Sequence, residues 1–110
     1  MKLYLDTSTS TTILKLDDTT YEWESGRNLA RDLLKFIHDK LAEQGKDFKD
    51  LTEQHFFAGP GSFTGLRIGA TVINTLANDL NIPLYNQRGE KVALILPEYG
   101  RPANITPPKK

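Results

Sequence analysis

The order of apolar patterns along the 110-residue chain constrains its fold more than any other feature. Short segments rich in apolar, aromatic and β-branched residues predict strands at 2–6, 13–17, 19–24, 53–58 and 84–86. Apolar residues at helical spacing predict helices at 28–44 and 63–80. Strands that alternate with helices in this order predict an α/β fold in which the later strands run parallel to the first.

Both predicted helices carry features that one core contact does not explain. In the first, Leu33, Phe36 and Ile37 can face a sheet, while Leu34 and Leu41 widen the apolar stripe sideways. In the second, glycines 65 and 69 are four residues apart and share one face, although each costs about 1 kcal/mol relative to alanine. These features predict a close approach by the sheet beneath or by another helix.

A glycine-rich stretch, GPGSFTGLRIG at 59–69, joins the fourth predicted strand to the second helix. A dinucleotide fingerprint fails because its third glycine is one residue late, and a P-loop fails because Leu66 stands where lysine is required. A hydrolase elbow fails because Pro60 and Thr64 flank Ser62 where glycines are required. No catalytic residue is therefore assigned.

Two interpretations of this glycine-rich stretch remain open. Ser62 can cap the first free amides of the following helix, which favours a tight structural or docking connection. A helix start also attracts anions, so a nucleotide or phosphate contact stays as the alternative. Its candidate residues are Gly59, Gly61, Ser62, Thr64 and Gly65.

Composition excludes several classes of function. Fourteen basic and fourteen acidic residues give no net charge that would draw the whole chain to nucleic acid or to an anionic membrane. The absence of cysteine excludes disulfides, thiolate zinc sites and cysteine nucleophiles. With no signal-peptide pattern and no run of about 18 apolar residues, we expect a cytoplasmic protein without a membrane partner.

Isolated polar residues give weaker signals. Asp6, at the end of the first strand, could hold a metal-bound water, but a role as acceptor for the hydroxyls of the Ser/Thr-rich turn at 7–12 is favoured. His38 and His55 have no partner at metal-ligand spacing, so no metal site is predicted. Arg67 is equally compatible with a solvated residue and an interface anchor.

The chain divides into a domain at 1–87 and an extended, proline-rich tail at 88–110. Within the second part, VALIL at 92–96 is an apolar run of uncertain type, and Lys109 and Lys110 are expected to be solvated.

The stretch GPGSFTGLRIG and the opening LYLDTSTSTTILKL resemble the signatures of the bacterial TsaB (YeaZ) family. The resemblance covers about residues 1–87 and implies a single actin-like, ribonuclease-H-like domain: a five-stranded mixed sheet with helices on its faces. It further implies a non-catalytic subunit that pairs with the paralogue TsaD and acts with the ATPase TsaE. Such complexes install threonylcarbamoyl on the adenosine beside the anticodon of tRNAs reading codons that begin with A.

The resemblance also implies that the two helices form the pairing surface, against TsaD or a second copy of the chain. The residues expected there are Leu34, Ile37, Leu41, Phe63, Leu66, Arg67, Gly69, Ala70 and Ile73. Contact with tRNA would be indirect, through the complex. No cofactor is expected on this chain alone, although ATP or ADP could bind at a composite site formed with the partners. The alternative function is that of a small nucleotide-binding or ATPase module.

Two departures from the family pattern stand out. The second domain of family members is missing, although LPEYGR at 96–101 resembles the ending of full-length members, which suggests loss of the middle of the protein. Asn28-Leu29 stands where many members have a His-Ser or His-Thr pair, so no role of that histidine is carried over.

Overall fold

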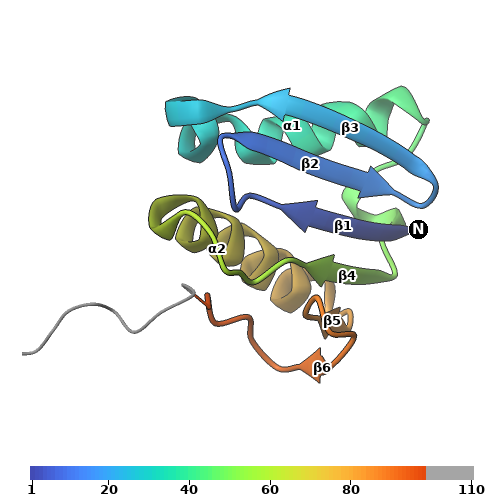
Figure 1. Ribbon diagram of the computed structural model, residues 1–110. Coiled ribbons are helices and arrows are strands. Elements are labelled where there is room, and N and C mark those ends of the chain that lie inside the picture. The colour runs from blue at the N-terminus through green and yellow to red at the C-terminus, as the bar shows by residue number, and fades with distance from the viewer. Residues whose placement is uncertain (99–110) are drawn as a thin grey trace, which may run out of the picture.

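The computed structural model describes residues 1–98, and its elements follow the predicted order of strands and helices (Figure 1). The strands are β1 (Lys2–Asp6), β2 (Thr11–Leu16), β3 (Thr19–Glu24), β4 (Glu53–Phe56), β5 (Leu84–Tyr85) and β6 (Lys91–Val92). The helices are α1 (Leu29–Glu43) and α2 (Phe63–Leu80), with 3-10 turns η1 (Gly26–Asn28) and η2 (Phe48–Asp50). The predicted α/β class is confirmed.

The strands form one mixed sheet in the order β3-β2-β1-β4-β5-β6. Strand β4 pairs in parallel with β1 on one side and with β5 on the other, whereas β2, β3 and β6 pair antiparallel with their neighbours. The prediction of five strands is wrong by one, because residues 91–92 pair with β5. A two-residue strand is too short to show an alternating pattern, so only backbone pairing reveals it.

Strand β2 begins two residues earlier than predicted. Thr11 and Thr12 pair with Glu24 and Trp23 of β3, which confines the Ser/Thr-rich turn to residues 7–10. Both threonines are β-branched and therefore suit a strand at least as well as a turn.

Both helices cover the same face of the sheet (Figure 1). Helix α1 connects β3 to the parallel β4, and α2 connects β4 to the parallel β5, so both crossovers move across the sheet in the same direction. Because such crossovers are right-handed, two that advance in one direction place their helices on one side. The opposite face carries no helix from residues 1–98.

The hydrophobic core lies between the sheet and the two helices. Alternate residues of the central strands point toward the helices, where they meet one line of apolar residues from each helix. The fully buried members are Leu3, Leu5, Leu14, Leu16, Leu33, Ile37, Leu41, Phe56, Leu66 and Ile73. Trp23 of β3 stacks on Phe36 of α1 with ring centroids 4.7 Å apart, which extends this core to the sheet edge.

The segment after β5 packs against the domain. Ile95 is buried in the same core, and the Asn74 side chain of α2 accepts from its amide at 2.8 Å and donates to its carbonyl at 3.0 Å. The first part of the predicted tail is therefore attached to the domain, whereas its remainder, 99–110, including Lys109 and Lys110, lies outside the described residues.

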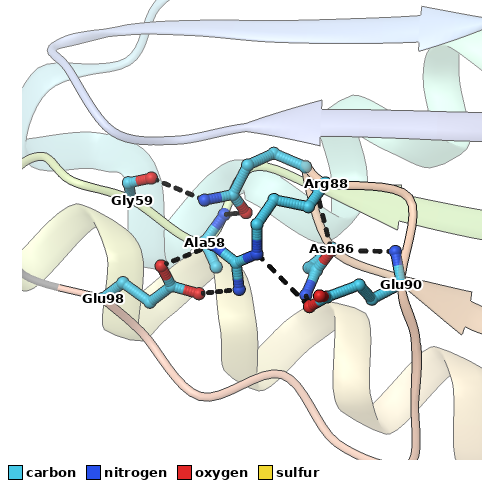
Figure 2. A network of polar contacts seen from close by, with 7 residues as sticks. Ala58, Gly59, Asn86, Arg88, Glu90 and Glu98 are labelled. Carbon is cyan, nitrogen blue, oxygen red and sulfur yellow. Dashed lines mark hydrogen bonds and ion pairs between the residues drawn. The ribbon is translucent and has the colours of Figure 1, made fainter.

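A polar network fixes this segment beside the start of the glycine-rich stretch (Figure 2). Arg88 donates to both carboxylate oxygens of Glu98, at 3.0 and 2.8 Å, and the Glu98 amide donates to the carbonyl of Ala58. Gln87 bonds the Ala58 amide and the Gly59 carbonyl, at 3.0 and 2.7 Å. The hydrogen bonds from Arg88 lower the pKa of the Glu98 carboxyl below its usual value.

Candidate protein–protein interface

The glycine-rich stretch forms a tight turn between β4 and α2. The Ser62 amide donates to the Ser8 carbonyl at 2.7 Å, which ties this turn to the turn between β1 and β2. The Ser62 hydroxyl accepts from the Gly65 amide at 3.1 Å, so the predicted N-cap of α2 is confirmed. The Gly59–Pro60 peptide bond within the turn is cis.

Glycines on α2 let the helix contact the strand beneath it. A Cβ atom on Gly69 would lie 2.7 Å from the Phe56 ring and would also collide with the Thr7 hydroxyl. A Cβ on Gly65 would collide with the Thr7 carbonyl, while the Thr7 hydroxyl donates to the Gly65 carbonyl at 2.7 Å. The close approach that the sequence predicted is therefore made by the domain's own sheet.

Six of the nine residues expected at the pairing surface are part of the domain core. They are Ile37, Leu41, Leu66, Gly69, Ala70 and Ile73, all of which are buried in the folded domain. These six therefore take part in the packing of the folded domain itself, and their contact with a partner stays a prediction. Helical spacing identifies an apolar face, but it does not show which of its adjacent lines turns toward the sheet.

The other three expected residues are exposed. Leu34 on α1 is 50% exposed, Phe63 at the start of α2 is 55% exposed, and the Arg67 side chain also lies at the surface. Their presence at a partner surface remains a prediction.

A shallow groove of about 370 Å³ runs between the outer sides of the two helices. Ala30 lines it from α1, and Ile68 and Val72 line it from α2, one turn apart. Leu34 follows Ala30 by one turn on the same side of α1. We call this surface the helix seam; it comprises Ala30, Leu34, Thr64, Arg67, Ile68, Thr71 and Val72.

Ala30, Ile68, Thr71 and Val72 are absent from the sequence-based prediction. The pairs 30/34 and 68/72 each have a four-residue spacing, next to the buried positions 33 and 69. That spacing is visible in the sequence. The pair 68/72 could be assigned to the surface, however, only once the structure showed that Gly69 beside it contacts the core.

Of the residues expected at a phosphate contact, some pack within the domain and some line a cleft. Gly59, Gly61 and Gly65 pack against backbone of the same domain. Ser62, Thr64 and Gly65 also line a cleft of about 500 Å³ between the β1–β2 turn and the starts of both helices. Arg27, Thr9 and Ser10 line its other side. Phosphate binding there remains a prediction.

The isolated polar residues have local partners. Asp6 accepts from the amide and the hydroxyl of Ser8, at 2.8 and 2.6 Å, which confirms the favoured interpretation. The His55 ring lies 2.6 Å from a Glu53 carboxylate oxygen, and His38 is exposed beside Asp39. Among residues 1–98, no three His, Asp or Glu side chains come together in a group that could hold a metal ion. The same residues contain no helix that is both long and apolar enough to cross a membrane.

Comparison with known proteins identifies the family. The model of the family described as "TsaD: tRNA N6-adenosine threonylcarbamoyltransferase" matches residues 23–86. The chain is 35% identical over 86 residues to the tRNA threonylcarbamoyladenosine biosynthesis protein TsaB of Haemophilus influenzae, covering 74% of this chain and 36% of that protein. It is 42% identical over 48 residues to the Bacillus subtilis protein of the same name, covering 44% and 21%.

The solved structure of YeaZ from Pseudomonas aeruginosa superposes with a TM-score of 0.68 at 32% identity, covering 77% of this chain and 42% of that one. The chain belongs to the TsaB/YeaZ family. It spans less than half the length of these TsaB/YeaZ relatives. The actin-like, ribonuclease-H-like fold that the sequence resemblance implied is that of its structural neighbours.

Proposed function

We propose that this chain is a non-catalytic pairing subunit in the biosynthesis of threonylcarbamoyladenosine in tRNA, and that it binds a TsaD-like protein through the helix seam. The observation that carries the proposal is the partly apolar groove between α1 and α2, with the half-exposed Leu34 one helical turn beyond its lining residue Ala30. Its support from relatives is the name of the TsaB proteins and the match to the TsaD family model. A TsaE-like ATPase is the third component in this proposal.

The helix seam has the composition expected of a helix-packing surface. Small and medium apolar side chains such as Ala30, Ile68 and Val72 form a groove into which ridges of another helix pair can pack. Leu34 extends beyond the groove, and Arg67 supplies the charged rim that such surfaces often have.

The test is co-purification with the cognate TsaD-like protein, followed by affinity measurement with Leu34→Glu and with the control Lys35→Glu. Leu34→Glu places a charge in the partner's apolar contact, and loss of an anchor worth about 2 kcal/mol lowers affinity roughly thirtyfold. Lys35 is the next residue on α1 and is exposed, so its reversal leaves pairing nearly unchanged. Equal binding by the Leu34→Glu variant refutes the assignment of the surface, and absence of any complex refutes the partner.

The function itself is tested in the cell. Deletion of the gene is expected to lower threonylcarbamoyladenosine in bulk tRNA, and expression of the chain, but not of its Leu34→Glu variant, is expected to restore it. Unchanged modification after deletion contradicts the proposed function.

A nucleotide-binding module is the second candidate, favoured by the cleft at the start of α2 with Ser62, Thr64 and Arg27 in its walls. Calorimetry with ATP and ADP tests it, first on the chain alone and then on the complex. Heat of binding only in the complex supports a composite site, whereas no heat in either excludes this candidate.

A further inference from the structure

Within residues 1–98, both helices lie on one face of the sheet and leave the other face without a helix (Figure 1). A row of aromatic and basic residues crosses that uncovered face. Lys15 of β2 pairs in register with Tyr4 of β1, Tyr4 with His55 of β4, His55 with Tyr85 of β5, and Tyr85 with Lys91 of β6. We call these five residues the sheet row. Side chains at paired positions point to the same face, so three rings stand between two lysines.

The sheet row is continuous. The rings of His55 and Tyr85 stack with centroids 4.8 Å apart and planes 18° from parallel. The Lys15 ammonium lies 5.5 Å from the centre of the Tyr4 ring. With strands spaced by about 4.8 Å, the backbones that carry Lys15 and Lys91 are separated by four spacings, or about 19 Å.

Space above the row is open to a ligand. A cavity of about 340 Å³ lies over the part of the row formed by Lys15, Tyr4 and His55, and its other lining residues are Lys2, Asp17, Asn86, Gln87 and Gly89. A tyrosine phenol is neutral near pH 7, and burial, reinforced by the charge of Asp6, raises the pKa of the Tyr4 phenol further above its ordinary value of 10. A neutral aromatic ring is what a base needs to stack on, whereas a phenolate would repel a phosphate.

Nearby carboxylates have local partners. Glu53 is bonded to His55, Asp6 to Ser8, and Asp17 accepts from the Lys2 amide at 2.8 Å. Lys15 and Lys91 are exposed at the two ends of the aromatic group. The row therefore offers rings on which bases can stack and, at each end, a lysine that can contact a phosphate.

We propose that the uncovered sheet face binds a short segment of single-stranded RNA, with bases stacked on Tyr4, His55 and Tyr85 and phosphates contacted by Lys15 and Lys91. Aromatic side chains on an open sheet stack on unpaired bases in one common kind of RNA-binding module, and basic side chains beside such rings bind the backbone. Lysine is depleted in protein–protein interfaces relative to the rest of the surface, so a face bounded by lysines suits RNA better than a protein partner. The inference does not depend on the helix seam, which lies on the opposite side of the sheet.

The experiment measures anisotropy of a fluorescein-labelled, unstructured ten-nucleotide RNA with the full chain between 50 and 200 mM salt. We expect the double variant Lys15→Ala/Lys91→Ala to bind at least tenfold more weakly. Loss of two phosphate contacts should also lower the slope of log affinity against log salt by about 1.4. Both lysines are exposed, so this variant is expected to fold normally, which circular dichroism verifies.

Tyr85→Ala is expected to weaken binding about tenfold without changing the salt slope, because stacking is not an ionic contact. Lys49→Ala, an exposed lysine on η2 outside the row, is the matched control and should bind RNA as the unaltered chain does. Leu34→Glu should also bind RNA normally, so failure of the pairing proposal and failure of this one are distinguishable. Absence of binding at 50 mM salt, equal binding by the double-lysine variant, or equal affinity for a duplex of the same sequence overturns the inference.

Discussion

Replacing Gly69 with alanine separates two explanations of the glycines on α2. If this face of the helix were open to a partner, alanine would fit freely and would stabilise the isolated domain by about 1 kcal/mol through its higher helix propensity. In the structure, the new Cβ instead lies 2.7 and 2.8 Å from two atoms of the Phe56 ring and collides with the Thr7 hydroxyl. The two explanations therefore predict changes in stability of opposite sign.

The size of the loss follows from the surroundings. Phe56 and Thr7 are both completely buried, so neither can move away into solvent. Overpacking such a site by one methyl group costs about 1–3 kcal/mol. Displacing the Thr7 hydroxyl also weakens its 2.7 Å bond to the Gly65 carbonyl, worth about 1 kcal/mol. After the gain in helix propensity, we expect a net loss of about 1–3 kcal/mol in the free energy of unfolding.

Urea denaturation followed by Trp23 fluorescence measures this change, since Trp23 stacks on Phe36 and reports on core packing. Thr75→Ala, at an exposed position of α2, is the control and is expected to be neutral or slightly stabilising. A Gly69→Ala variant that is as stable as the unaltered domain, or more stable, would refute the assignment of this helix face to the core.

Two further predictions concern the start of α2 and the segment after β5. Ser62→Ala removes the side-chain acceptor of the Gly65 amide and should lower the free energy of unfolding by about 1 kcal/mol, measured by the same urea titration; an unchanged midpoint contradicts the cap. Because Arg88 lowers the pKa of Glu98, the stability from this pair is present above the ordinary value of 4.5 and is lost as the pH falls through the lower folded-state pKa. The protection factor of the Ile95 amide, which is the intrinsic exchange rate divided by the observed rate at the same pH, should therefore fall as the pH is lowered. Glu98→Gln should abolish that dependence, and identical profiles for the two proteins would contradict the coupling.

Much of the fold was predictable from local sequence. Alternation in β1 and β2, the helical spacing in α1 and α2, and the Ser62 cap each depend on residues close in the chain. Such patterns predict an element because its period and its caps are set within one or two turns. The side of the sheet on which both helices lie also follows from element order and the handedness of crossovers.

The candidate site was predictable only in part. The wide apolar stripe on α1 and the spaced glycines on α2 are visible in the sequence, but the burial of each residue is not. Leu34 and Arg67 are exposed, whereas Gly69 and Ile73 are buried. Several adjacent lines of residues run along a helix, and any of them could face the core. The line containing Gly69 does so because Phe56 and Thr7 lie beneath it, and the sequence of the helix does not show where those two residues lie.

The sequence by itself determined the order of strands and helices, the turn at Ser62 and the family resemblance, because each is carried by residues near one another in the chain. Tertiary structure alone decided which apolar residues are core and which form the helix seam. It also decided that Lys15, Tyr4, His55, Tyr85 and Lys91, drawn from five strands, lie in one row. Sheet register sets that row, and register depends on pairings between residues distant in sequence.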